Sequence, residues 1–416
     1  MDNNPLLFYN RFHILNNFKT IGELILIYAD HAATTKLSSY AQKKMLPYLN
    51  EYYQNPSSLY SAAATSRQAI AQARTVIADA IHAKTEEIFF TSGGTEADNW
   101  ALKGIAFSQL ANIHNASHLN PPPRNQIITT QIEHHAILNT CSFLEKLGFE
   151  IIYLPVNKEG FVSPECLEKY ITDKTLLVSI MYANNELGTI EPICALSSIA
   201  HRHGALFHTD AVQALGHIPV HVDNLGIDLL SASAHKFYGP KGCGFLFIRQ
   251  GIPIFPLFHG GQQEDGKRAG TENPALIVGM AAALEESIQD MDHLTPHLHT
   301  LTQHLLSRLK KAKLNFSMNG PSMPHLRLPG LLNLSFWEGD GEMLLHRLDL
   351  ANIAVSTGAA CNARNTELSH VLQAIHLPAS YAYGTIRISL GKENTLDEID
   401  YLADTLIKII QSSSIL

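Results

Sequence analysis

Short apolar runs recur along the chain between residues 88 and 248, and segments with helical spacing separate most of them. Runs of this kind are typical of buried β-strands. Strands that alternate with helices favour an α/β fold with a mostly parallel sheet, which carries its site along the carboxyl edge. The seven expected strands are Ile88–Phe90, Gln126–Thr129, Glu150–Leu154, Leu176–Met181, Ala205–Thr209, Asp228–Ala232 and Gly244–Ile248.

Helical spacing is clearest before the first of these strands. Between Ser66 and Ile81, apolar residues return every three or four positions, which predicts an amphipathic helix. Ala106 to Arg124 instead lacks a regular pattern and contains Pro121-Pro-Pro123, so we expect an irregular surface segment there.

The pattern changes near Ala281, where long helical stretches such as His297 to Ala312 begin. A short strand is expected at Leu331–Phe336, and Thr395 with Glu398 forms a capping box that starts the last helix. We therefore expect an N-terminal extension, a large domain and a smaller α+β C-terminal domain, at residues 1–26, 27–280 and 281–416.

Composition fits a globular protein with a large core, since 45% of the 416 residues are hydrophobic and 16% are charged. A net charge of −8 gives no basic field for nucleic acid and no polybasic patch for a membrane. The 22 histidines show no metal-binding spacing, so no metal site is expected. The five cysteines are scattered without a C-x-x-C motif, which favours a reducing compartment such as the cytoplasm.

A lysine and an aspartate follow two of the predicted strands. Lys236 comes in a polar turn after Asp228–Ala232, and Asp210 directly follows Ala205–Thr209. In a parallel sheet, both would face one crevice. Such a pair suits pyridoxal phosphate, which a lysine holds as a Schiff base while an acid protonates its ring nitrogen. Taken singly, Lys236 is better explained as a surface turn lysine and Asp210 as a helix cap.

A glycine turn follows the strand at Ile88, in the run Thr91-Ser-Gly-Gly-Thr-Glu-Ala-Asp98. A helix that starts at such a turn presents free N–H groups and suits a phosphate, to which Thr95 could add a hydroxyl. We expect Thr95 and Asp98 to form a capping pair here. Many turns of this kind bind nothing.

Other candidate residues lie near predicted strand ends or in the C-terminal part. The His134 ring could stack on a flat cofactor, and the amides of Asn185 and Gln213 could bond its phenolic oxygen. Each could also be ordinary loop polarity. Cys361 lies in a run of small residues with Gly358, from which we predict a mobile loop. Arg387 could fork onto a substrate carboxylate, or be a solvated strand residue.

Together these segments resemble the cysteine desulfurases of the NifS/IscS kind, in the class V aminotransferase superfamily and fold type I of pyridoxal-phosphate enzymes. The likeness runs from about Ile27 to Ile410. Its most specific runs are Thr91-Ser-Gly-Gly-Thr-Glu-Ala-Asp-Asn99, Ser233-Ala-His-Lys-Phe-Tyr-Gly-Pro-Lys-Gly242, Arg268-Ala-Gly-Thr-Glu-Asn273 and Ser356-Thr-Gly-Ala-Ala-Cys361.

The resemblance implies a homodimer that converts L-cysteine to L-alanine and passes sulfur to an acceptor or iron–sulfur scaffold protein, or into thiolated tRNA. It also implies the nucleophile, the substrate-carboxylate site and the contacts of pyridoxal 5'-phosphate. These roles fall to Cys361 as nucleophile, Lys236 as Schiff-base lysine, Asp210 at the ring nitrogen, His134 on the ring, Asn185 and Gln213 at the phenolic oxygen, Gly94, Thr95, Ser233 and His235 at the phosphate, Thr271 at the neighbouring subunit's phosphate, and Arg387 at the carboxylate.

Five positions depart from the family's pattern, namely Tyr60, Tyr182, Gln262, Asp265 and Ala359. Asp265 stands where the family has an arginine, and this reversed charge could weaken the cofactor site or the dimer. Three alternatives remain open: an aminotransferase, a selenocysteine lyase, or a non-catalytic scaffold that retains the fold.

Overall fold

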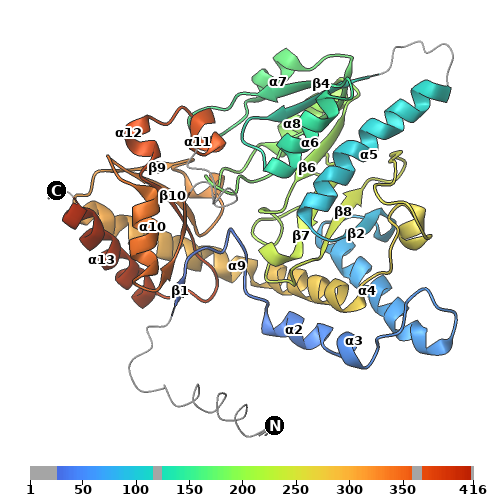
Figure 1. Cartoon of the computed structure of the whole chain (residues 1–416), viewed down its shortest axis with the longest axis horizontal. Coiled ribbons are helices and arrows are strands. Elements are labelled where there is room, and N and C mark those ends of the chain that lie inside the picture. Colours follow the sequence, from blue (N-terminus) through green and yellow to red (C-terminus); the bar gives the residue numbers. More distant parts are fainter. Residues whose placement is uncertain (1–25, 116–123, 358–367, 414–416) are drawn as a thin grey trace, which may run out of the picture.

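The seven expected strands form one sheet in a computed structural model, which describes residues 26–115, 124–357 and 368–413 (Figure 1). Only β8 runs antiparallel to its neighbours, and the other adjacent pairs are parallel. The prediction of a mostly parallel sheet is therefore confirmed. In spatial order the strands are β2 (Ile88–Thr91), β8 (Gly244–Ile248), β7 (Leu229–Ser233), β6 (Leu206–Asp210), β5 (Thr175–Ser179), β3 (Gln126–Thr130) and β4 (Glu150–Leu154).

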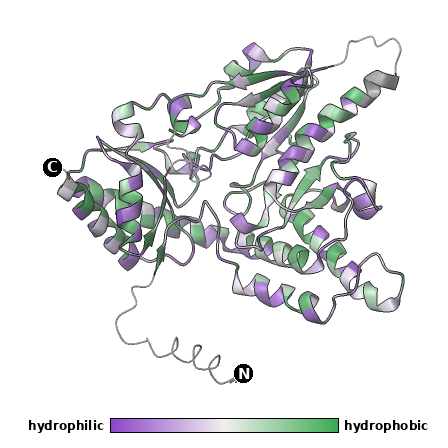
Figure 2. Cartoon of the chain, in the orientation of Figure 1, coloured by the Kyte–Doolittle hydropathy of each residue, from purple (hydrophilic) through white to green (hydrophobic). Residues whose placement is uncertain are grey.

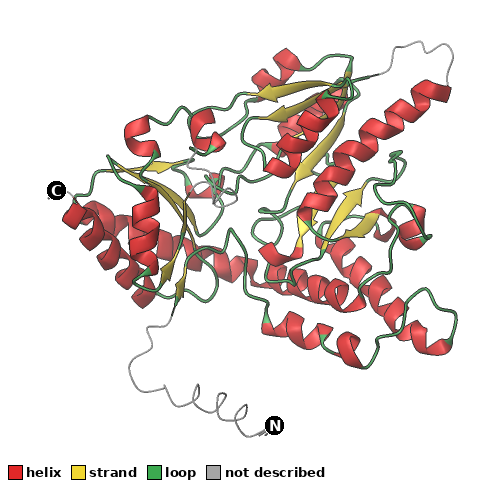
Figure 3. Ribbon diagram, viewed as in Figure 1, coloured by secondary structure: helices red, strands yellow, loops and turns green. Residues whose placement is uncertain are grey.

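Side chains on both faces of this sheet are buried. Successive side chains along a strand point to opposite faces. Phe89 packs in the cluster that α5 and α6 supply, whereas Phe90 packs in the cluster of α4, α7, α8 and the first part of α9. Helices therefore cover both faces (Figure 3). Their bounds are α4 (Ala64–Ala80), α5 (Gly94–Asn115), α6 (His135–Glu145), α7 (Pro164–Tyr170), α8 (Ile193–Arg202) and α9 (Pro274–Lys311).

A second, four-stranded antiparallel sheet forms most of the C-terminal part, in the order β12-β13-β10-β9. One face of it packs on the last part of α9 and on α10 and α13, and these helices show alternating hydrophobic and hydrophilic stretches (Figure 2). The elements are β9 (Phe316–Asn319), β10 (Leu331–Phe336), α10 (Gly341–Asp349), β12 (Ser356–Thr357), α11 (His370–Ala374), α12 (Ala379–Ala382), β13 (Thr385–Ser389) and α13 (Leu396–Ser413). The expected capping box is present, since Thr395 N–H donates to Glu398 Oε2 at 3.1 Å.

Two features link the two parts of the chain. The 38-residue helix α9 contributes Ile277 and Met280 to the core of the larger sheet and Leu298 and Leu305 to that of the smaller one. At the other end, β1 (Ile27–Tyr28) pairs in parallel with β11 (Ile353–Ala354). The division at residue 280 stays a prediction, and α9 runs across it.

Two expectations about α5 were wrong. The helix continues to Asn115, so the first half of Ala106–Arg124 is not irregular; residues 116–123 lie outside the described chain. Thr95 also lies inside the first turn, because α5 begins at Gly94. The capping contact comes instead from Glu96, whose Oε2 accepts from Ser92 N–H at 2.8 Å, while Asp98 is buried.

Other helices lie before α4: α2 (Ser39–Met45) and α3 (Pro47–Asn50). Within the residues that the structure describes, no helix has the length and apolar character needed to cross a bilayer. The expected extension lies outside these residues, except for Leu26.

Candidate active site

The carboxyl ends of β6 and β7 bring Asp210 and Lys236 into one electrostatic environment. Asp210 is the last residue of β6 and is buried, and Lys236 closes the short 3₁₀ turn that follows β7. Burial raises the pKa of the Asp210 carboxyl, and the charges of nearby His134 and Lys236 oppose that rise. Asp210 and Lys236 therefore lie near each other at the carboxyl edge of the sheet, as the strand order predicts.

Lys236 also reaches a turn near the start of the chain. Its Nζ donates to the carbonyl oxygens of Ala32 at 2.6 Å and Ala33 at 2.9 Å. The side-chain amide of Gln213 donates to the same Ala32 oxygen at 2.8 Å. This turn therefore holds both the lysine and one of the expected amides beside Asp210.

His134 lies at the start of α6, close to Asp210 and Lys236. It caps the helix, because its Nδ1 accepts from Ala136 N–H at 3.1 Å, and this bond fixes the ring. Burial lowers the pKa of His134, while the charge of Asp210 acts in the opposite direction. A flat ring with a lowered pKa thus lies close to the Asp210 carboxyl group.

A cavity of about 360 Å³ opens between the start of α5 and the turn after β7. Gly94, Thr95, Ser233 and His235, the four residues expected at a phosphate, all line it. A Cβ at position 94 would lie 2.6 Å from Val212 Cγ2, and Gly93 has a φ of 150°, so the turn needs both glycines. The first N–H groups of α5, which lack helical partners, lie at this cavity.

Two further lining residues were missed by the sequence analysis. Lys241 brings a positive charge, and with Lys236 it adds to the burial that lowers the pKa of His235 to about 4. Thr34 Oγ1 lies 3.1 Å from His235 Nδ1. Lys241 could have been predicted from the sequence, because it lies in the same polar run as Lys236. No feature of the sequence indicated Thr34.

Arg387 lies on β13 in the other sheet and is buried, with 3% of its side chain exposed. Its Nη1 donates to the backbone oxygen of Asn185 at 3.0 Å, and its Nη2 to Asp30 Oδ1 at 2.9 Å. The interpretation of Arg387 as a solvated strand residue is therefore wrong. Asn185 contacts Arg387 through its backbone carbonyl group. The sequence did not predict that Asp30 would contact Arg387.

Cys361 and Ala359 lie outside the described residues, but the chain on both sides is anchored at this site. Ser356 on β12 pairs with Arg387 on β13. After the gap, Ser369 Oγ donates to Glu186 Oε2 at 2.6 Å, and His370 Nε2 lies 3.0 Å from the carbonyl oxygen of Glu133. The expected mobility of this segment stays a prediction.

Thr271 does not line the 360 Å³ cavity of its own chain and is exposed on the loop after β8. Arg268 holds this loop against α5, because its guanidinium group donates to both carboxylate oxygens of Glu96 at 2.9 and 3.1 Å. The loop that presents Thr271 is thus fixed to the helix whose start lines the cavity.

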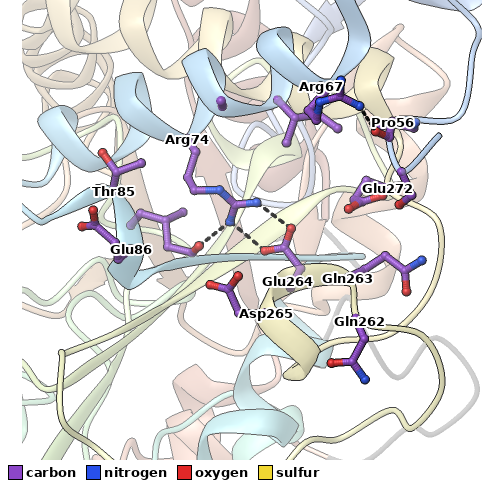
Figure 4. Close-up of a pocket in the computed structure, with 14 residues that line it drawn as sticks. Pro56, Arg67, Arg74, Thr85, Glu86, Gln262, Gln263, Glu264, Asp265 and Glu272 are labelled. Atoms are coloured by element: carbon purple, nitrogen blue, oxygen red, sulfur yellow. Dashed lines mark hydrogen bonds and ion pairs between the residues drawn. The ribbon is translucent and has the colours of Figure 1, made fainter. Parts of the chain in front are cut away.

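The same loop also borders a second cavity, of about 490 Å³, where Arg74 and Glu264 point toward each other (Figure 4). Arg74 donates to the two oxygens of Glu264 at 2.6 and 2.7 Å, and Phe90 N–H donates to Glu264 at 2.9 Å. Asp265 lines this cavity and is exposed, and the close-up draws no bond from it to another lining residue. Asp265 does not line the 360 Å³ cavity, where the phosphate is expected.

The remaining departures from the family pattern fall at different depths. Tyr60 and Gln262 are exposed, whereas Tyr182 is buried and its hydroxyl donates to the carbonyl oxygen of Pro219 at 3.4 Å. None of these three lines the 360 Å³ cavity.

Replacing Arg74 by methionine should destabilise the fold by about 3 kcal/mol, because the buried Glu264 carboxylate would lose its cation. Urea unfolding would measure this as a lower midpoint. The matched control is Arg202→Met, whose partner Glu168 is largely exposed, and it should leave the midpoint unchanged. Equal shifts of the urea midpoint for the two variants would show that the Arg74–Glu264 pair contributes no more to stability than an exposed ion pair.

The family model described as aminotransferase class-V matches residues 27–402. "Cysteine desulfurase IscS" of Dictyoglomus turgidum is 50% identical over 385 residues, covering 92% of this chain and 94% of the relative. The protein of the same name from Methanosarcina thermophila is 47% identical, with 92% of both chains covered.

Solved structures agree with this similarity. A structure titled "NIFS-LIKE PROTEIN" aligns with a TM-score of 0.85 and 37% identity, covering 93% of this chain and all of its own. Another, titled "SspA in complex with cysteine", aligns with a TM-score of 0.75 and 36% identity, covering 88% of this chain and 98% of its own.

Proposed function

This chain belongs to the class-V aminotransferase family, and on that premise we propose that it is a pyridoxal-phosphate-dependent cysteine desulfurase. The observation that carries the proposal is the meeting of Lys236, Asp210 and His134 beside a glycine-lined cavity at the start of α5. Relatives with the name cysteine desulfurase at about half identity support the same reaction.

The residues at this site fit pyridoxal 5'-phosphate. The cavity offers helix N–H groups, hydroxyls, His235 and the Lys241 charge for the phosphate. Lys236 would hold the cofactor covalently, Asp210 would face its ring nitrogen, and His134 would lie on the ring. Gln213 and Asn185 would serve the phenolic oxygen. When bound, the cofactor supplies an electron sink for the substrate's α-carbon.

Side chains of the protein would bind the substrate, move its α-carbon proton and attack its sulfur. Arg387 would bind the carboxylate of L-cysteine, and Lys236 would move the proton at the α-carbon. The Cys361 thiolate would then attack the substrate sulfur. A sulfur–sulfur bond forms while the carbon–sulfur bond of the substrate breaks. The electron pair of the broken bond stays with the substrate carbon, which becomes the methyl group of L-alanine after protonation.

The assembly and destination of the sulfur extend this proposal. Thr271, exposed on a loop that is fixed to α5, would reach the phosphate of a second copy, giving a homodimer. The persulfide on Cys361 would pass to an acceptor or scaffold protein for iron–sulfur clusters or tRNA thiolation. A cytoplasmic location suits this chemistry, because a reducing compartment keeps the nucleophilic thiol available.

Product analysis tests the proposed reaction. Holoenzyme supplied with L-cysteine and a thiol reductant should release L-alanine and sulfide in equal amounts. A keto acid in place of alanine would indicate an aminotransferase. Turnover of selenocysteine with none of cysteine would indicate a selenocysteine lyase, and no product from either would favour a scaffold.

Replacing Asp210 by asparagine should lower the rate of alanine release by about 10- to 1,000-fold. An opposite charge close to a titrating nitrogen raises its pKa by about 1–3 units, and the neutral amide removes this effect. The rate and the pH titration of the cofactor's absorbance would both be measured. Asp223→Asn, at an exposed aspartate, is the control and should change neither. An Asp210→Asn variant with normal rate and titration would remove Asp210 from the proposed site.

A further inference from the structure

Arg387 is held by two segments that lie far from it in the sequence. Its Nη1 donates to the Asn185 carbonyl and its Nη2 to the Asp30 carboxylate, which is 357 positions away. Its Nε is buried and has no hydrogen-bond partner among the described residues. A guanidinium group carries five N–H donors in a rigid plane, so this arrangement fixes the plane and leaves the Nε edge for another acceptor.

Asp30 begins a turn whose other end holds Lys236. The Asp30 carbonyl accepts from Ala33 N–H at 3.0 Å, and the carbonyls of Ala32 and Ala33 accept from Lys236 Nζ. The turn therefore contacts Arg387 through its first side chain and Lys236 through its last two carbonyls.

The turn is also fixed to the strand that carries Arg387. Ser389 Oγ accepts from Ala32 N–H at 2.9 Å, and the Ser389 carbonyl accepts from His31 N–H at 3.1 Å. Since Ser389 lies two residues after Arg387 on β13, the guanidinium and the turn are held by one rigid element. The position of the turn relative to Arg387 is therefore fixed by β13.

We infer that Asp30 is a positioning residue that orients Arg387, so that the turn Asp30–Ala33 makes the site select α-amino acids with a free carboxylate. This inference deepens the proposed function, because it rests on the roles given there to Arg387 and Lys236. An α-amino acid carries its carboxylate and its amine on one carbon. The turn joins Arg387, which would bind the carboxylate, to Lys236, whose link to the cofactor the substrate amine would replace. Amines that lack the carboxylate cannot use the oriented guanidinium.

The test compares ligands that differ only in the carboxylate. Binding of L-alanine and of ethylamine to the holoenzyme is followed by the change in cofactor absorbance, which needs no sulfur transfer. In Asp30→Ala, the Kd of L-alanine should rise about 10- to 100-fold, as expected for the loss of a charged hydrogen bond, and that of ethylamine should stay within about twofold. Asp30→Asn, which keeps an acceptor, should show a smaller rise.

Two controls separate positioning from general damage. Asp173→Ala, at an exposed aspartate, should leave both Kd values unchanged. Arg387→Ala should lose the preference for L-alanine, and Asp30→Ala should add little to that loss, because one residue acts through the other.

Equal weakening of L-alanine and ethylamine in Asp30→Ala would overturn the inference, as would a wild-type enzyme without preference for L-alanine. Additive losses in the double variant would also contradict it. If the wild-type enzyme released no alanine from L-cysteine, the proposed function would fail. A loss of L-alanine preference confined to the Asp30 variants would then still support the role of Asp30.

Discussion

A Lys236→Ala variant should lose alanine release from L-cysteine by about 10⁴-fold or more, which is the upper range for removal of a positioned acid or base. The loss should be this large because Lys236 would both hold the cofactor and move the α-carbon proton. The visible absorbance of the purified protein should also fall, since the cofactor would be held only by non-covalent contacts. Activity and absorbance after gel filtration would measure the two effects.

Lys174→Ala is the matched control for this experiment, because Lys174 is exposed in the loop before β5. It should retain both activity and absorbance. Normal absorbance together with normal turnover in Lys236→Ala would mean that another amine holds the cofactor, and the assignment of the crevice would be wrong.

Replacing Cys361 by serine should abolish sulfur transfer without disturbing the cofactor. The serine hydroxyl is not ionised near neutral pH, so it lacks the thiolate's reactivity. The variant should keep its visible absorbance and its affinity for L-alanine, while release of alanine from L-cysteine should become undetectable. This combination would separate cofactor binding from the attack on sulfur.

The other cysteines provide the controls for Cys361→Ser. Burial raises the pKa of both Cys141 and Cys243 to about 12, so neither is a thiolate near neutral pH. Cys194 is exposed, and Cys194→Ser should retain full activity. Loss of activity in Cys194→Ser but not in Cys361→Ser would transfer the role of nucleophile to Cys194.

The fold was largely predictable because its signals are local. Each strand of the larger sheet is an apolar run that helices cover on both faces, and the alternation of strand and helix indicates parallel pairing. The errors arose at α5, where Ala106–Asn115 continues a helix that the prolines after it seemed to exclude. The mistaken cap at Thr95 shows that an S/T-x-x-D/E spacing does not determine where a helix begins.

The site was predictable to the extent that it depends on strand ends. Lys236 and the glycine turn each follow a strand and Asp210 ends one, so the sheet alone brings them to one edge. The Asp30–Arg387 and Arg74–Glu264 pairs join residues 357 and 190 positions apart, and periodicity carries no information about such contacts. The roles of the site residues stay predictions. Thr271 would act on a second copy, and Cys361 lies outside the described residues.

The most direct test of the proposed reaction is a single turnover of holoenzyme with L-cysteine in the absence of reductant. We expect one L-alanine for each sulfur atom retained by the protein, and peptide mass spectrometry should locate that sulfur on Cys361. Alanine formed without sulfur on Cys361, or sulfur retained on a different cysteine, would contradict the account.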